Sequence, residues 1–133
     1  MNSKEQAKRI YVLCIAKAKL KKTLTYGEVL LSLGYKMGLP GYTIRYGLEL
    51  VLIACGYLGL PMLTVIVVDQ ASGKPSAGGY AGSSWDKDAE RAFNHKKWPD
   101  VSEIDWVYIW INRKELSKKY GTPDYWEPSK REK

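Results

Sequence analysis

The chain has 133 residues, 45% of them hydrophobic, which is enough for one compact domain with an ordinary core and excludes a disordered protein. Lysine and arginine outnumber aspartate and glutamate by 21 to 14, and the formal net charge of +7 favours an anionic partner: nucleic acid, an anionic membrane or an acidic protein. The apolar runs are too short to span a bilayer, and the N-terminus has no apolar segment of the signal-peptide type. We therefore expect a cytoplasmic protein without a membrane partner.

The two cysteines, Cys14 and Cys55, both lie in apolar stretches, and the chain has one histidine, His95. Buried thiols in a reducing compartment account for both cysteines. No spacing of the zinc-site type connects them with the histidine. The sequence therefore predicts neither a metal nor a cofactor.

The first third of the chain predicts two helices. Residues 3–21 have helical apolar periodicity, and Ser3 with Gln6 three positions later forms a capping-box pattern. A second helix begins at the run Thr25-Tyr26-Gly27-Glu28, which is another capping box. Gly34 is placed to end this helix, because glycine readily adopts the left-handed conformation found after a helix C-terminus.

The middle of the chain predicts a third helix followed by a strand and a loop. The helix begins at Thr43 and runs to Leu58, and the turn before it completes a helix-turn-helix pattern. The β-branched run over 63–68 predicts a buried strand. The turn-forming stretch 69–74 and the glycine-rich loop 75–82 follow it, as in the wing of a winged helix.

The last third is rich in aromatic residues. Residues 84–96 predict a short helix with Ser84 as its cap. Residues 104–112 alternate in a way that favours a second strand, pairing with 63–69, although a helix over 103–119 also fits. Residues 121–133 are polar and predict a flexible tail.

These elements predict an α+β fold: a winged helix-turn-helix of three helices and a small antiparallel sheet, with an aromatic-rich C-terminal extension. A single domain would cover residues 1–120, followed by the tail over 121–133.

One series of residues along the chain carries a family resemblance. It consists of Thr25-Tyr26-Gly27-Glu28-Val29, Gly34, Arg45, Gly47, Leu60-Pro61-Met62 and Val65-Ile66-Val67-Val68. In this order the residues resemble the DNA-binding domain of the alkylguanine DNA alkyltransferases and the alkyltransferase-like proteins. The resemblance covers roughly residues 10–82 and implies a winged helix that binds DNA.

The resemblance breaks at the position of the reactive thiol. The family has Pro-Cys-His-Arg where this chain has Pro61-Met62-Leu63-Thr64. Alkyl transfer needs a thiolate activated by a neighbouring base, and a thioether cannot supply one. Cys55 lies in an apolar helix half, where burial raises the pKa of a thiol. We therefore expect a protein that is not an enzyme.

The resemblance also implies a DNA-binding role for particular residues. Arg45 matches the arginine that enters the base stack in the family, on a helix whose start also carries Thr43 and Tyr46. Tyr26 matches a tyrosine near the bound strand, although packing across the helix start explains it equally well.

Two further cations are predicted to contact DNA. Lys36 flanks the expected recognition helix and Lys74 lies on the expected wing. Both would contact phosphates, which fix affinity and position but do not read the base sequence. We expect duplex DNA, rather than a single strand, as the partner.

The alternative is a protein-interaction module, an inhibitor or accessory subunit of a complex that handles nucleic acid. Trp106, Tyr108 and Trp110 would anchor that interface, because tryptophan and tyrosine are typical interface anchors. Exposure of these side chains would favour a protein partner, whereas a positive helix-and-wing face would favour DNA. An enzyme is the third interpretation, for which the sequence offers no catalytic constellation.

Overall fold

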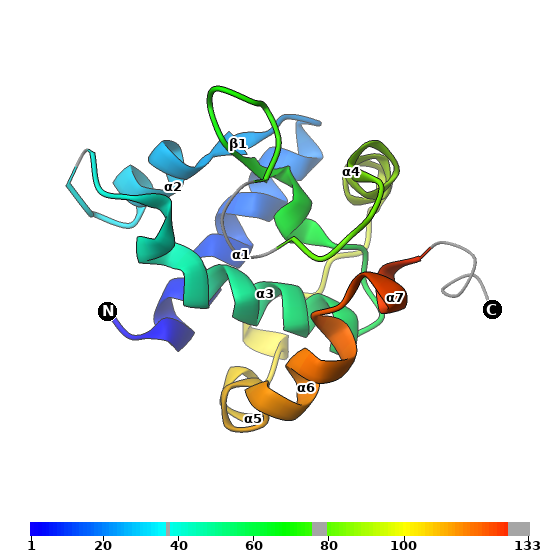
Figure 1. Cartoon of the computed structure of the whole chain (residues 1–133). Coiled ribbons are helices and arrows are strands. Elements are labelled where there is room, and N and C mark those ends of the chain that lie inside the picture. Colours follow the sequence, from blue (N-terminus) through cyan, green and yellow to red (C-terminus); the bar gives the residue numbers. More distant parts are fainter. Residues whose placement is uncertain (37, 76–79, 128–133) are drawn as a thin grey trace.

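The computed structural model describes residues 1–36, 38–75 and 80–127. This part of the chain contains seven α-helices, three 3₁₀ helices (η) and a two-stranded sheet, so the fold is mostly helical and of the α+β class (Figure 1). In chain order the elements are α1 (Ser3–Lys19), β1 (Leu24–Thr25), α2 (Tyr26–Ser32), η1 (Gly41–Ile44), α3 (Arg45–Tyr57), η2 (Leu63–Ile66), β2 (Val67–Val68), α4 (Trp85–Asn94), η3 (Val101–Glu103), α5 (Trp106–Ile111), α6 (Arg113–Tyr120) and α7 (Pro123–Trp126).

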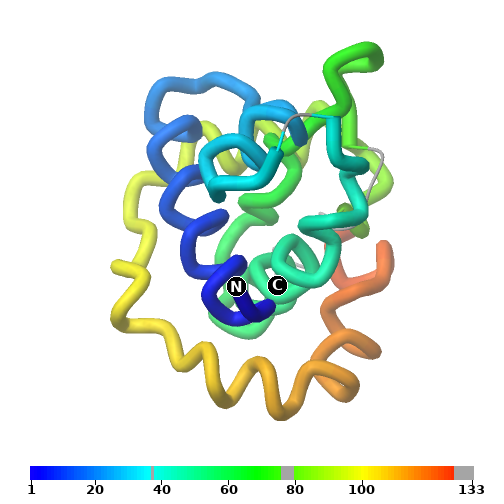
Figure 2. Tube along the Cα trace, turned by 90° about the vertical axis from the view of Figure 1, so that its left-hand side faces the viewer, coloured from blue at the N-terminus to red at the C-terminus, as the bar shows by residue number. Residues whose placement is uncertain are grey.

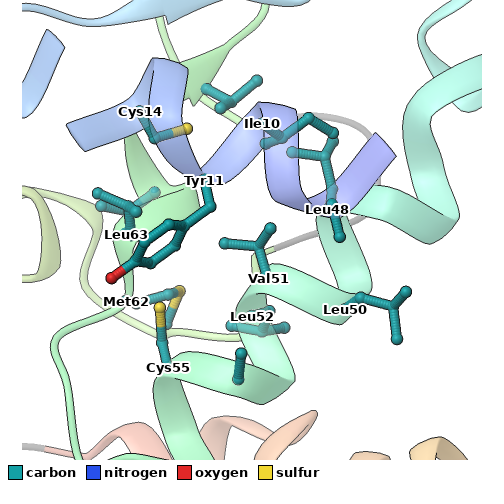
Figure 3. Close-up of a cluster of buried hydrophobic side chains, with 14 of the residues drawn as sticks. Ile10, Tyr11, Cys14, Leu48, Leu50, Val51, Leu52, Cys55, Met62 and Leu63 are labelled. Carbon is teal, nitrogen blue, oxygen red and sulfur yellow. The ribbon is translucent and has the colours of Figure 1, made fainter. Parts of the chain in front are cut away.

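The core lies between α1 and α3 (Figure 3). Tyr11 extends from α1 into this core, and its hydroxyl donates a hydrogen bond to the Pro99 carbonyl at 2.7 Å. Its ring meets the edge of Trp106 at a centroid distance of 5.8 Å. Tyr11 therefore joins α1 to the segment over 95–105, which runs alongside that helix towards α5 (Figure 2).

The start of α1 differs from the sequence prediction. The N-cap is Asn2, whose side chain accepts a hydrogen bond from the Glu5 amide at 2.9 Å, so the predicted Ser3 cap is wrong. Gln6 does not close a capping box either, because its side chain is buried and bonds to other parts of the chain.

The predicted capping box of α2 is confirmed. The Thr25 hydroxyl accepts from the Glu28 amide, and the Glu28 carboxylate accepts from the Thr25 amide, both at 3.1 Å. The bond from the Thr25 backbone is the main reason why the pKa of the Glu28 carboxyl is lowered. Gly34 has φ +87°, which confirms it as the residue that ends this helix.

The third predicted helix forms in two parts. A 3₁₀ turn over Gly41–Ile44 leads into α3, which starts at Arg45 rather than Thr43 and has Leu58 at its C-cap. Every residue of the second half of α3, over 50–56, is buried. This burial agrees with the apolar composition of that half.

The predicted antiparallel sheet is wrong. Most of the run 63–68 is η2, and only Val67–Val68 forms a strand, which pairs in parallel with Leu24–Thr25. Burial on all sides produces a continuous apolar run in a strand or a helix alike, so periodicity could not separate them.

The predicted second strand over 104–112 is also wrong. The alternative of a helix over 103–119 is correct in type, but the segment forms two helices, α5 and α6, that meet at Asn112. The Asp105 carboxylate caps α5 by accepting from the Tyr108 amide at 3.0 Å. Trp106 and Ile109, three positions apart, both point into the core. Every residue of 106–111 is apolar or aromatic, so the composition of this short run did not separate a helix from a strand.

The predicted tail packs onto the fold as far as Glu127. Trp126 in α7 is 2% exposed, and its indole N–H donates to the Tyr120 carbonyl at 2.7 Å. The Tyr125 hydroxyl donates to the Gly56 carbonyl at 3.0 Å, which brings α7 against the end of α3. Residues 128–133 of the predicted tail lie outside the described residues.

Replacing Trp126 with alanine should destabilise the protein by about 3–5 kcal/mol, because it removes a large buried side chain and leaves a cavity. Urea unfolding followed by circular dichroism measures this loss. The exposed Lys114→Ala on α6 is the control and should stay within about 0.5 kcal/mol of the native protein. Equal stabilities of the two variants would show that α7 is not part of the folded domain.

Candidate nucleic-acid interface

A groove of about 800 Å³ opens where three segments that are distant in sequence meet at the surface. They are the start of α2, the η1–α3 junction and the loop that follows β2. The β1–β2 register, which pairs Thr25 with Val68, brings the first and third segments together. The residues that line the groove are Thr25, Tyr26, Gly27, Gly41, Tyr42, Arg45, Glu49, Asp69, Gln70 and Ala71.

The loop after β2 is held in a defined shape by Asp69. Its carboxylate accepts hydrogen bonds from the amides of Ala71 at 2.8 Å and Ser72 at 3.2 Å. Its backbone amide donates to the Lys74 carbonyl at 2.8 Å, and its carbonyl accepts from Gly73, which has φ +71°. The loop is therefore closed on itself, with the exposed Lys74 side chain at its end.

Arg45 is held by an ion pair on its own helix. Its Nε–H donates to the Glu49 carboxylate at 3.1 Å, one helical turn along α3. The pair is solvent-exposed and has the arginine before the glutamate, the less favourable order along a helix. Such a pair is weak, so a hydrogen-bond acceptor of a bound ligand can replace Glu49 as the partner of the guanidinium.

Two exposed tyrosines flank Arg45. Tyr42 is 71% exposed and Tyr46 is 64% exposed, and the Arg45 guanidinium lies 6.0 Å from the Tyr46 ring centroid. Large apolar rings held at the surface beside a cation can stack on nucleobases. Tyr42 was not among the predicted site residues. The available signal was its spacing of four positions from Tyr46, which places two residues on the same side of a helix.

The structure brings some of the predicted DNA-binding residues together and separates others. Tyr26 and Arg45 both line the groove, but Tyr26 is only 8% exposed and packs in the core. The Thr43 carbonyl accepts a hydrogen bond from Gln6, so this residue has a structural role. Lys36 and Lys74 are exposed but do not line the groove.

The groove also contains residues that sequence reasoning missed. Thr25 and Glu49 were not among the predicted site residues, and Thr25 was assigned only to the helix cap. Asp69 was assigned only to a turn. Pairing of the two short strands places it beside the start of α2, and no local pattern indicates that contact.

Of the three residues predicted to form a protein interface, Tyr108 alone is exposed. Trp106 is buried, with its indole N–H donating to the Val101 carbonyl at 3.1 Å. Trp110 is half-buried and lies between two cations, with Arg113 at 4.0 Å and Lys4 at 5.3 Å from its ring centroid. Burial of Trp106 removes it from any docking surface in this conformation.

A different set of α5 side chains is exposed. Val107, Tyr108 and Ile111 face solvent, and the Tyr108 ring packs against exposed Tyr57 of α3 at a centroid distance of 5.3 Å. We call these four residues the α5 face. It is an apolar surface at the end of the molecule formed by α5 and α6.

Three sulfur-containing side chains lie in the interior. Cys14, Cys55 and Met62 are all buried, and the two thiols point into the core between α1 and α3 (Figure 3). Burial is the main reason why the pKa of the Cys14 thiol is raised, with Cys55 as the second contribution. The thiolate of Cys14 is therefore suppressed at neutral pH.

Among the described residues, no group of three or more His, Cys, Asp or Glu side chains is arranged to hold a metal ion. No helix in these parts of the chain is both long and apolar enough to cross a membrane.

Comparisons with family models, with curated proteins and with solved structures gave no match to this chain. The resemblance to the alkyltransferase DNA-binding domain therefore rests on the sequence motifs alone.

The thiols of the native protein should react with Ellman's reagent far more slowly than a free thiol, because both are buried and burial suppresses the Cys14 thiolate. Both should react at once in guanidinium chloride. Measuring the Cys55→Ala variant reports Cys14 alone. A native thiol whose reaction rate rises with pH like that of a free cysteine would contradict the buried placement and reopen thiol chemistry.

Proposed function

We propose that the chain is a non-catalytic DNA-binding protein that holds duplex DNA against the groove between α2, the η1–α3 junction and the 69–74 loop. In this proposal the arrangement is a helix-turn-helix, with α3 as the recognition helix and the 69–74 loop in the place of a wing. The observation that carries it is an open groove lined by an exposed guanidinium, Arg45, and an exposed aromatic ring, Tyr42, with a second exposed ring, Tyr46, beside Arg45 but outside the groove lining.

The charges of the groove limit how DNA can bind. Its lining contains one cation, Arg45, and two carboxylates, Glu49 and Asp69. The Asp69 carboxylate is engaged by the amides of its own loop, and Glu49 is paired with Arg45. The groove lining therefore has too little positive charge to bind phosphates strongly. Phosphates would instead be neutralised at its margins, while Arg45 and the exposed tyrosines contact bases.

We assign those margins to exposed lysines that lie close in sequence to the segments lining the groove. Lys74 ends the loop that begins at Asp69, and Lys36 follows α2, whose first residues line the groove. Lys21 and Lys22 are exposed in the turn immediately before β1, whose Thr25 lines the groove. Together with the net charge of +7, these lysines support electrostatic attraction of duplex DNA.

The absence of catalysis is part of the proposal. Met62 occupies the position that the resemblance assigns to the reactive cysteine, and it is buried in the core. Neither Cys14 nor Cys55 lines the groove, and both are buried. DNA held in the groove would therefore meet no thiol.

The test is fluorescence anisotropy with a labelled duplex at several salt concentrations, comparing the native protein with Lys36→Ala/Arg45→Ala/Lys74→Ala. Each lost phosphate contact should reduce the slope of log affinity against log salt by about 0.9. We expect weaker binding and a shallower slope in the variant. Failure of the native protein to bind duplex at low salt would contradict the proposal.

A matched control distinguishes the loss of contacts at the groove from the general effect of lowering the net positive charge. The variant Lys114→Ala/Lys118→Ala/Lys119→Ala removes the same number of positive charges from exposed positions on α6. It should keep most of the native slope, because α6 packs on the far end of α3 from the groove (Figure 1). Equal losses in the two variants would show that DNA does not bind at the groove.

Replacing Glu49 with glutamine should tighten duplex binding by about two- to fivefold, because it releases Arg45 from a weak ion pair and removes a negative charge from the groove. The gain should disappear in the Arg45→Ala background. Exposed Glu90→Gln on α4 makes the same change of net charge away from the groove and should have a smaller effect. A gain that persists without Arg45 would mean that Glu49 acts only through its charge.

A protein-interaction module is the second candidate. The α5 face supports it, because four apolar or aromatic side chains gather there on neighbouring helices. Such a surface would be independent of the groove. The two functions can therefore coexist in one chain.

A further inference from the structure

We propose that Gln6 is a positioning residue for the DNA-binding face, which it serves by capping α3 from across the fold. The inference rests on the proposed function, since it concerns the same groove.

The Gln6 side chain connects three segments of the chain. It lies on α1, is 5% exposed, and its Oε1 accepts a hydrogen bond from the Gly47 amide at 3.0 Å. Its Nε2 donates to the Thr43 carbonyl at 3.2 Å and to the Tyr35 hydroxyl at 3.1 Å. One buried amide group thus binds the segment after α2, the 3₁₀ turn η1 and the first turn of α3.

The start of α3 needs such a partner. The first amides of a helix have no acceptor within the helix, and a polar N-cap side chain normally satisfies one of them. The N-cap of α3 is Ile44, which cannot do so and makes no side-chain cap bond. Gln6, 41 positions earlier in the chain, supplies the missing acceptor through Gly47.

The pairing of positions 6 and 47 is also steric. A Cβ atom at Gly47 would lie 2.5 Å from the Gln6 Oε1 and 2.8 Å from its Cγ. Any larger residue at position 47 would therefore displace the amide that caps the helix. Glycine allows α3 to approach α1 closely enough for this bond to form.

The two ends of the amide are not interchangeable. The oxygen faces an N–H donor at Gly47, and the nitrogen faces the carbonyl acceptor of Thr43. A carboxylate at position 6 would keep the first bond and place a second oxygen against that carbonyl. Hydrogen bonds of this kind fix direction, whereas apolar contacts between α1 and α3 do not.

The hydrogen bonds of Gln6 lie next in sequence to the exposed side chains at the groove. Thr43 lies next to Tyr42 in η1, and Gly47 lies next to Tyr46 in α3. Arg45 is between them. Through its bonds to the Thr43 carbonyl and the Gly47 amide, Gln6 holds the backbone on both sides of the junction that presents these three side chains.

The experiment compares Gln6→Met, which removes all three side-chain hydrogen bonds at similar size, with Gln6→Glu, which keeps the acceptor for the Gly47 amide but loses the N–H donor to the Thr43 carbonyl. The control is Val51→Ala, a buried change in the middle of α3 that should destabilise the protein without altering the junction. Urea unfolding, amide hydrogen exchange at Gly47 and duplex anisotropy are measured for each.

We expect Gly47 exchange to accelerate about tenfold in Gln6→Met relative to the later amides of α3, and duplex affinity to fall by a similar factor. Val51→Ala should lower stability while keeping duplex affinity within about twofold. In Gln6→Glu, affinity should recover as pH falls, because the protonated carboxyl can again donate to the Thr43 carbonyl. The native protein and Val51→Ala should not show that recovery.

Native exchange at Gly47 in Gln6→Met would overturn the capping, and native duplex affinity in both Gln6 variants would overturn the positioning role. No duplex binding by the native protein would instead reject the proposed function and with it the role of Gln6 in DNA binding. Exchange at Gly47 distinguishes these failures, because it is measured without DNA.

Discussion

The second half of α3 must be buried, whereas the first half carries exposed side chains, and the packing of the other elements satisfies both conditions. Residues 50–56 are apolar on all sides, so they must be enclosed, and α1, η2, α5 and α6 pack around them. The first half buries Gly47 and Leu48 but exposes Arg45 and Tyr46, and Tyr42 of the preceding turn η1 is exposed beside them. A single helix is therefore anchored in the core at one end and carries exposed polar and aromatic side chains at the other.

Anchoring one end does not orient the other, because hydrophobic packing is non-directional. The directional contacts lie at the junction: Gln6 binds both sides of it, and the Thr25 capping box fixes the start of α2 beside it. The β1–β2 pair then adds the loop that begins at Asp69. Polar contacts that are few in number thus set the geometry of the groove, while the core supplies the stability.

Local signals in the sequence predicted α1, α2, α4 and the buried half of α3, because capping boxes and helical periodicity depend on neighbouring residues. The sequence predicted strands for the run 63–66 and the segment 106–111, which are both helical in the structure. All four residues of 63–66 are buried, so the run shows no helical periodicity. In 106–111 only two residues are buried, which is too few to show that periodicity. The groove was predicted only through Tyr26 and Arg45. The contacts made by Gln6 and Asp69 depend on distant partners, and no local pattern encodes them.

The most direct test of the account is a nitrogen-15 chemical-shift map of the protein titrated with a short duplex. The account predicts that the largest shifts fall on the amides of Gly27, Gly41 and Ala71, which line the groove, and that Val107 and Ile111 of the α5 face stay unchanged. Shifts concentrated on the α5 face, or no shifts at all, would contradict the claim that this protein binds DNA through the groove.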